Sequence, residues 1–134
     1  HISTEGLEAS AQKASTTRRS TVTIGYSYTN VTADRFERLS KYTLDYARHS
    51  VVFSGSTAIP LRVTLGGRAD FRYRSDDRHY LLIDARVKRR FANLELFVDC
   101  TNLLNRAYRE VAGVDMPGRW LRFGAEIHMP SILP

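Results

Sequence analysis

Apolar and polar residues alternate along most of the chain, and the pattern is clearest from residue 61 to residue 73. One set of alternate positions there is Leu61, Val63, Leu65, Gly67, Ala69, Phe71 and Tyr73, and the other is Arg62, Thr64, Gly66, Arg68, Asp70 and Arg72. Successive side chains of a β-strand point to opposite faces, so this period of two predicts a strand with one apolar and one polar face.

The same alternation predicts six further strands, over residues 2–13, 21–29, 42–57, 80–88, 94–100 and 120–129. It is weakest at 2–13 and mixed at 42–57, where His49 shares a face with Ala47, Val51 and Phe53. Most of the expected strands have about eight to thirteen residues, whereas about five or six is usual in soluble sheets. A tilted strand needs roughly 9–11 residues to cross a bilayer.

The expected connections alternate in character, as they do between antiparallel strands whose two ends face different surroundings. The polar ones, two of them long, are Asn30–Lys41, Arg74–His79 and Asn102–Gly118, and the others are Ala14–Ser20, Thr57–Pro60 and Arg89–Asn93. Two stretches are expected to form short loop helices at most. These are Ala33–Leu39 and Leu103–Val111, the second with Asn102 as its N-cap.

Composition narrows the class of protein. The 134 residues fit one domain, which we expect to cover residues 1–129 with a short tail at 130–134. A lone cysteine, Cys100, excludes an internal disulfide and a CxxC metal site. No apolar run approaches the roughly 18 residues of a membrane helix. The first residues lack a signal peptide and an initiator Met, so we expect a fragment that begins within a longer protein.

The period of two does not by itself say which face is buried, because a soluble sheet alternates too. Three details favour an apolar face toward lipid: long strands, a polar face that carries Gly, Thr and both charge signs, and aromatic residues near strand ends. Those aromatic residues are Tyr26, Tyr28, Phe71, Tyr73, Tyr80, Phe91 and Trp120. A soluble β-barrel or clam that binds a small apolar ligand remains the alternative. It requires Val63, Leu65, Ile83 and Ile127 to point into a closed core.

The end of the chain carries a more specific pattern. Asn102-Leu103-Leu104-Asn105-x-x-Tyr108 is followed by Met116-Pro117-Gly118-Arg119 and a final strand. It resembles the C-terminal part of TonB-dependent outer-membrane receptors, in which an N-L-[FL]-[DN]-x-x-Y segment and an x-P-G-R turn precede the last barrel strand. Gly6-Leu7-Glu8 and Gly25-Tyr26-Ser27-Tyr28 also resemble strands of that family. Such barrels usually end on Phe or Trp, whereas this strand ends at Met129.

The resemblance implies an all-β fold: an antiparallel, up-and-down transmembrane β-barrel, of which about seven strands form an open curved sheet here. It implies a location in the outer membrane of a Gram-negative-type bacterium and contact with outer-membrane lipid. The implied function is TonB-energised uptake of a scarce nutrient such as a ferric siderophore or cobalamin. TonB and the plug domain would act through N-terminal regions that this chain lacks.

The motif residues are expected to have structural roles in the loop and at the start of the last strand. They are Asn102, Leu103, Leu104, Tyr108, Pro117, Gly118 and Arg119. Gly118 is expected to supply a positive φ in the turn. Arg62, Arg68, Arg72, Arg86, Lys88 and Arg122 are expected to face the lumen and to pair with Asp70, Asp84, Asp99 and Glu126 or with the plug, or else to attract an anionic ferric chelate.

The residues indicate no catalytic or cofactor chemistry. The chain has none of the GxSxG, HExxH or phosphate-loop motifs, so we expect no enzyme and no cofactor. His49, His79 and His128 lack metal-ligand spacing, and Cys100 is expected to pack on the apolar face. The charge of +6 is distributed along strands, so no nucleic-acid partner is expected. An outer-membrane enzyme or adhesin remains a third class, which would need a catalytic constellation on the polar face.

Overall fold

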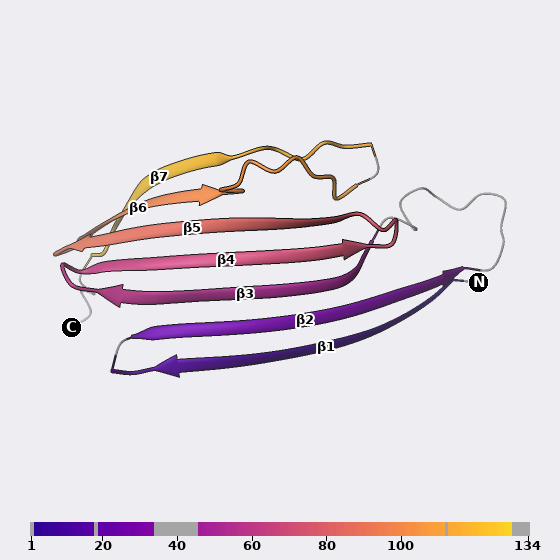
Figure 1. Ribbon diagram of the computed structural model, residues 1–134. Coiled ribbons are helices and arrows are strands. Elements are labelled where there is room, and N and C mark those ends of the chain that lie inside the picture. The colour runs from indigo at the N-terminus through magenta and orange to yellow at the C-terminus, as the bar shows by residue number, and fades with distance from the viewer. Residues whose placement is uncertain (1, 18, 34–45, 112, 130–134) are drawn as a thin grey trace.

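The computed structural model describes the chain except for residues 1, 18, 34–45, 112 and 130–134. The described residues form seven strands: β1 (Ile2–Ser15), β2 (Ser20–Ala33), β3 (Ala47–Ile59), β4 (Val63–Arg74), β5 (His79–Phe91), β6 (Leu94–Thr101) and β7 (Trp120–Ile127). Each strand pairs antiparallel with the next, in one sheet of order β1-β2-β3-β4-β5-β6-β7 (Figure 1). The predicted all-β, up-and-down topology is confirmed. The sheet stays open, because β1 and β7 do not pair with each other.

The strands are long, as predicted, but β2 and β5 continue to Ala33 and Phe91, into residues 30–33 and 89–91 that were expected to be connections. β1 and β2 have 14 residues each, β3 and β5 have 13, and β6 and β7 have eight. Strands of about five or six residues are usual in soluble sheets. The first five strands are therefore long enough to hold two distinct faces over many rows of side chains.

The start of β4 differs from the prediction. The strand begins at Val63, because Leu61 and Arg62 have φ of 66° and 57° and turn the chain back after β3. Two successive positive φ values are typical of the tight turns that match the twist of a β-hairpin. The alternation of side chains runs on through this turn, so the pattern alone placed the strand start two residues early. Arg62 consequently lies in the turn, and the prediction that it belongs to the polar face of a strand is wrong.

The connections divide between the two ends of the sheet as predicted. The end of β2, the start of β3, the β4–β5 connection and the long loop 102–119 lie at one end, and the turns that follow β1, β3 and β5 lie at the other (Figure 1). Residues 34–39 of the expected helical turn Ala33–Leu39, residues 42–45 of the third expected strand, and the tail 130–134 fall outside the described residues.

The expected helical turn over Leu103–Val111 is not formed, and the prediction is wrong. Asn102 and Asn105 have φ of 50° and 52°, in the left-handed region, so the chain turns sharply at each. Asn tolerates this region better than most residues. Among the described residues, no helix is long and apolar enough to span a membrane.

The register assembles the alternating residues into rows across the sheet. Ala11, Ile24, Phe53, Ala69 and Ile83 form one row. One position along, Gln12, Thr23, Ser54, Arg68 and Asp84 form the next row, on the opposite face. We call these two surfaces the apolar face and the polar face.

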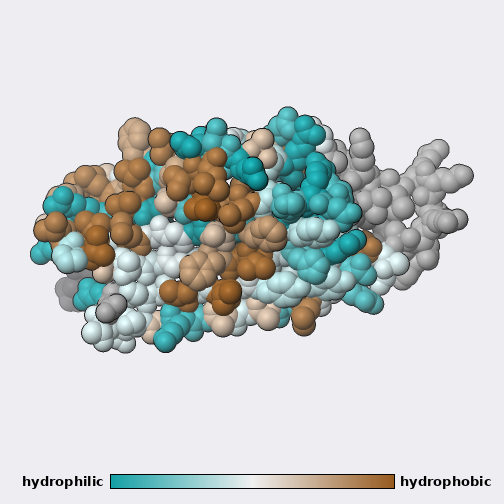
Figure 2. All heavy atoms as spheres, in the orientation of Figure 1, coloured by the Kyte–Doolittle hydropathy of each residue, from teal (hydrophilic) through white to brown (hydrophobic). Residues whose placement is uncertain are grey.

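The apolar face is open to the surroundings. Phe123 is 84% exposed, Ile127 72% and Leu65 39%. In Figure 2, hydrophobic residues form a broad patch over the strands, and hydrophilic residues gather toward the end that carries the long loops. Tyr80 and Cys100 are the buried hydrophobic residues within the described part of the chain. The sheet thus has almost no hydrophobic core of its own.

An aromatic row closes the apolar face at its loop end. The ring centroids of Tyr28 and Tyr73 lie 5.1 Å and 6.0 Å from that of His49, and the Tyr26 hydroxyl lies 2.8 Å from His49 Nδ1. Phe71 and His79 extend the row, with centroids 6.2 Å apart. Cys100 lies on the apolar face as predicted, opposite Ala85 and Leu121. Two of the aromatic residues near strand ends, Tyr80 and Trp120, lie on the polar face, as their place in the alternation predicts, because they pair with Arg72 and Thr101.

Candidate functional site

The polar face carries ion pairs that run across strands. Arg86 on β5 and Arg122 on β7 flank Asp99 on β6 in one row of the register. Arg86 donates to Asp99 with N···O distances of 2.5 Å and 2.7 Å, and Arg122 donates with distances of 3.1 Å and 2.6 Å. Asp99 is only 6% exposed, so its charge is compensated by two cations rather than by water.

Two further carboxylates also lie between two cations, Asp70 within β4 and Glu95 across β5 and β6. Asp70 accepts from both Arg68 and Arg72, at 3.3 Å and 3.0 Å. Glu95 accepts from Lys88 at 2.8 Å and lies 3.8 Å from Arg90. The prediction that Arg68, Arg72, Arg86 and Arg122 lie on the polar face is confirmed, as is their pairing with Asp70 and Asp99. Asp84 has a different partner, since it accepts the backbone N–H of Asn102 at 2.9 Å.

The loop 102–119 folds over the polar face near the β4–β5 turn. Tyr108 packs on Tyr80 with ring centroids 5.1 Å apart. Glu110 accepts from Arg72 at 2.7 Å through its carboxylate and from Arg74 at 3.0 Å through its carbonyl. The loop is therefore held to the sheet by an aromatic contact and two arginines, and Tyr108 anchors it as the sequence predicted.

Asn102 fixes the point at which the loop leaves β6. Its Oδ1 accepts the Arg106 N–H at 2.8 Å, and its Nδ2 donates to the carbonyls of Arg106 and Pro117 at 2.8 Å and 3.4 Å. Its own N–H donates to Asp84, and its carbonyl accepts the Asn105 N–H. The predicted structural role of Asn102 is thus found, but as the centre of a turn rather than as a helix cap.

Asn105 joins the two ends of the loop. Its Oδ1 accepts the Arg119 N–H at 2.9 Å, directly before β7 begins. A Cβ on Gly118 would lie 2.6 Å from that same oxygen. Gly118 is not among the residues with positive φ, so the reason for glycine here is this close approach and not the turn conformation that the sequence suggested.

The remaining motif residues contribute mainly through the backbone. The Leu103 N–H donates to the Ile83 carbonyl at 2.7 Å, and the Pro117 carbonyl accepts from Asn102. The side chains of Leu103 and Leu104 are exposed. The motif thus brings together two asparagines and the turn before β7, as expected of structural residues.

Gly124 accommodates a ring from the neighbouring strand. It pairs with Phe97, and a Cβ at Gly124 would lie 2.6 Å from the ring tip of Phe97. The Arg86 guanidinium lies 5.6 Å from the centre of the same ring. A glycine on the polar face is therefore part of the packing around the Arg86–Asp99 pair.

Charged groups of the loops shift one another's pKa values. The hydrogen bond from Arg109 lowers the pKa of Asp115, and the hydrogen bond from Arg78 lowers the pKa of Asp76. Burial and the nearby Glu110 raise the pKa of Tyr108 above its usual value. At neutral pH both carboxyls are therefore charged, and the Tyr108 hydroxyl keeps its proton and remains a hydrogen-bond donor.

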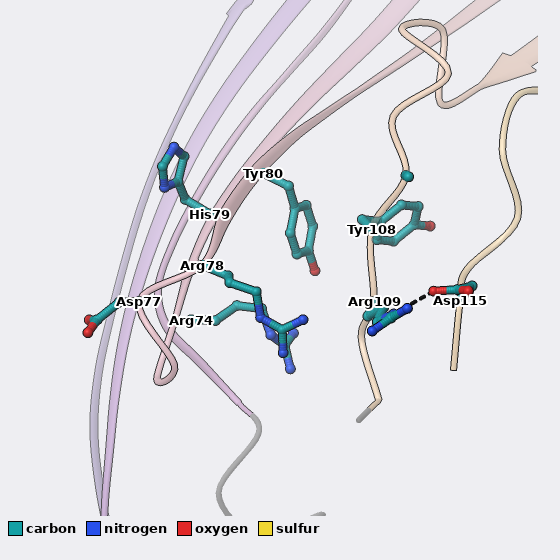
Figure 3. Close-up of a pocket in the computed structure, with 9 residues that line it drawn as sticks. Arg74, Asp77, Arg78, His79, Tyr80, Tyr108, Arg109 and Asp115 are labelled. Atoms are coloured by element: carbon teal, nitrogen blue, oxygen red, sulfur yellow. Dashed lines mark hydrogen bonds and ion pairs between the residues drawn. The ribbon is translucent and has the colours of Figure 1, made fainter. Parts of the chain in front are cut away.

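A hollow of about 520 Å³ lies between the β4–β5 turn and the loop 102–119. It is lined by Arg74, Asp77, Arg78, His79, Tyr80, Ala107, Tyr108, Arg109 and Asp115 (Figure 3). Among these residues, the sequence assigned the role of anchoring a loop only to Tyr108. The sequence places Tyr80 near a strand end and Arg74 in a polar connection. It does not predict the hollow, because the packing of the loop onto the sheet has no periodic pattern in the sequence.

One group of neighbouring side chains consists of residue types that can bind a metal ion. Ligand atoms of Glu95, Glu126 and His128 lie within 4.8 Å of one another. Lys88 and Arg90 already approach Glu95, and the Arg90 guanidinium lies 3.0 Å from His128 Nε2. The cluster therefore acts as a charge-balanced network at the turn end of the sheet.

Comparison of the chain with protein-family models, curated proteins and solved structures finds no match.

Proposed function

We propose that this chain forms the closing strands of an outer-membrane β-barrel of the TonB-dependent receptor type. The observation that carries the proposal is the inverted distribution of polarity. The charged face satisfies its charges internally and receives the loop 102–119, whereas the apolar face has no cover. A barrel wall between lipid and a polar interior has this distribution.

The apolar face fits the lipid-facing side of such a wall. Exposing one large apolar side chain to water forgoes about 1.5–3 kcal/mol relative to burying it. The row of Tyr26, Tyr28, His49 and Tyr73 at the loop end combines rings with polar tips, as side chains at a membrane–water interface do. The long loops lie at this same end, which we assign to the outside of the cell.

The transport function rests on the motif residues. Asn102, Asn105, Tyr108 and the turn before β7 hold one another in place, as expected if the N-L-[FL]-[DN]-x-x-Y and P-G-R segments serve the same structural role as in that family. The proposed substrate is a scarce nutrient such as a ferric siderophore or cobalamin. A plug domain and TonB would act through regions outside this chain.

The alternative is a soluble β-barrel or clam that binds a small apolar ligand. It requires a second layer over Leu65, Ile127 and their neighbours, which are exposed in this sheet. Lipid accessibility distinguishes the two proposals, because a soluble protein hides the same face from lipid.

The first experiment measures accessibility in the native protein reconstituted in vesicles. Single cysteines are introduced in a Cys100→Ala background at two pairs of adjacent residues. The first pair is Phe53 and Ser54 on β3, and the second is Leu65 and Thr64 on β4. The two residues of a pair lie on opposite faces of the sheet but at nearly the same depth in the bilayer. We expect a fluorophore at 53 or 65 to be quenched by brominated lipid and one at 54 or 64 to be spared. Quenching of neither member of a pair overturns the membrane proposal.

The second experiment addresses transport. Cells that carry the native protein, or a variant that lacks β7, are given radiolabelled ferric siderophores or cobalamin with and without an uncoupler. We expect uptake that needs both β7 and the proton-motive force. An embedded barrel whose loss leaves uptake of all these substrates unchanged would retain the membrane assignment but remove the receptor function.

A further inference from the structure

The hollow beside the β4–β5 turn contains a buried hydroxyl without a partner. Tyr80 is 6% exposed, and its Oη is buried and makes no hydrogen bond within the described structure. An unsatisfied buried hydroxyl is costly, so its partner is expected to come from outside the described residues. In Figure 3 the Tyr80 hydroxyl points toward the end of the hollow where Arg74 and Arg78 lie.

The hollow has more donors than acceptors. Its guanidinium groups are those of Arg74, Arg78 and Arg109, and each carries five N–H donors. Its two carboxylates are already engaged, since Asp115 accepts from Arg109 at 2.5 Å and Asp77 accepts from the Tyr73 hydroxyl at 2.6 Å. With three guanidinium groups and two carboxylates, the lining carries a net positive charge, which favours an anion.

The two walls come from segments far apart in the sequence. Tyr80 and Arg78 belong to β5 and the turn before it, and Tyr108 and Arg109 belong to the loop 102–119. Figure 3 shows Tyr108 and Arg109 on the loop segment that lies opposite Tyr80 and Arg78, with Arg109 turned toward Asp115. A group that accepts hydrogen bonds from both walls would hold the loop on the polar face.

We propose that this hollow binds an oxyanion, either a phosphate or a carboxylate group. The Tyr80 hydroxyl and the Arg109 guanidinium are its donors, and the Tyr108 ring forms a wall. Planar guanidinium groups suit both kinds of oxyanion, because they donate two parallel N–H groups. The assignment uses only the geometry of the hollow and does not depend on the transport proposal. A bound water is the competing partner for Tyr80.

The test is calorimetric titration of the reconstituted native protein with inorganic phosphate and, separately, with citrate. We expect saturable binding of at least one, and the preferred arm identifies the anion class. Tyr80→Phe keeps the ring and removes the hydroxyl, so it should weaken binding about tenfold or more. Tyr28→Phe, on the apolar face, is the matched control and should leave the affinity unchanged.

A second variant predicts the opposite sign. Asp115→Asn removes the carboxylate that competes for Arg109, so the anion should bind more tightly. Loop placement is checked in every variant by the rate of tryptic cleavage after Arg106 and Arg109. Absence of saturable binding of both anions, or an unchanged affinity in Tyr80→Phe with an intact loop, overturns the proposal and leaves water as the partner. Lipid quenching at positions 53 and 65 is unaffected by that outcome, so the barrel assignment is tested separately.

Discussion

At the scale of single residues, Gly124 is a position where the ring of a neighbouring residue leaves no room for a side chain. In Gly124→Ala the new Cβ would meet the Phe97 ring at 2.6 Å, so the ring must swing away from the Arg86 guanidinium. Overpacking of this kind costs about 1–3 kcal/mol. We expect a loss of that size in the free energy of unfolding, measured by urea titration in detergent micelles.

Gly25→Ala is the matched control for this prediction. Gly25 also lies within a strand on the polar face, and a Cβ there would meet nothing within 4 Å. Its effect should be small or of the opposite sign, since alanine restricts the unfolded chain. Equal losses in the two variants would show that the Phe97 ring is not the cause. The double variant Gly124→Ala/Phe97→Leu should recover most of the stability.

Asn102 leads to a second prediction at the same scale. Asn102→Ala removes the bonds to both backbone groups of Arg106 and places alanine at a φ of 50°. Asn102→Gly removes the same bonds but tolerates the conformation. We expect both variants to speed tryptic cleavage after Arg106 and Arg109, and Asn102→Ala to be less stable than Asn102→Gly by about 1–2 kcal/mol. Wild-type cleavage rates in both would contradict the assigned role of Asn102.

The sequence identified Asn102 as important but not what it does. An Asn after a strand is compatible with a helix cap and with a left-handed turn, because the same side-chain oxygen can accept a backbone N–H in either. The choice depends on contacts with Asp84, Arg106 and Pro117, which lie at different sequence separations. Gly118 is a similar case, since its neighbour Asn105 lies across the loop. Tyr80 is another, because only the folded loop brings Tyr108 to it.

At the scale of the elements, the period of two predicted the strands because each strand meets different surroundings on its two faces. The alternation of apolar and polar residues is a property of each strand's own sequence, so it can be recognised without knowing how the strands pair. Turns lack such a signal. Leu61 and Arg62 continue the alternation while the backbone reverses direction, and the strand boundary was therefore misplaced. Which cations pair with which carboxylates depends on register, and it appears only when β5, β6 and β7 are side by side.

The row Arg86, Asp99 and Arg122 should couple those three strands. Asp99→Asn keeps the shape of the side chain but leaves two guanidinium groups facing each other without a counter-charge. Hydrogen bonds to charged groups are worth about 1.5–3 kcal/mol. Both arginines are about half exposed or more, so solvent screening reduces the effect, and we expect about 1–2 kcal/mol. Urea titration in micelles measures it, and added salt should lessen the difference.

Asp76→Asn is the control for that experiment. Asp76 pairs with Arg78 in the exposed β4–β5 turn, where an ion pair contributes about 0–1 kcal/mol. Arg122→Met should also cost less than Asp99→Asn, because Arg86 still compensates Asp99. If Asp99→Asn were no more destabilising than Asp76→Asn, the row would not hold the three strands together.

At the scale of the whole molecule, both the apolar face and the two edge strands of the sheet need to be covered by something outside it. β1 and β7 each leave one edge unpaired, and the apolar face is open across all seven strands. Unpaired edges and large apolar patches both promote association in water. The polar face does not offset this exposure of apolar surface, because its charged side chains already pair with one another within the sheet. Stability of the sheet therefore depends on what covers the apolar face.

This dependence gives the last prediction. The isolated chain in buffer without detergent should sediment as oligomers or aggregates, and the addition of micelles should yield a monomer with the same β content by circular dichroism. Phe53→Ser and Phe123→Ser together should reduce association in buffer, because they remove two of the exposed rings on the apolar face. Ser54→Thr and Thr64→Ser, on the polar face of β3 and β4, should not. A monomer that melts sharply and reversibly in plain buffer would mean that the apolar face finds its cover within the chain, and the soluble alternative would then be preferred.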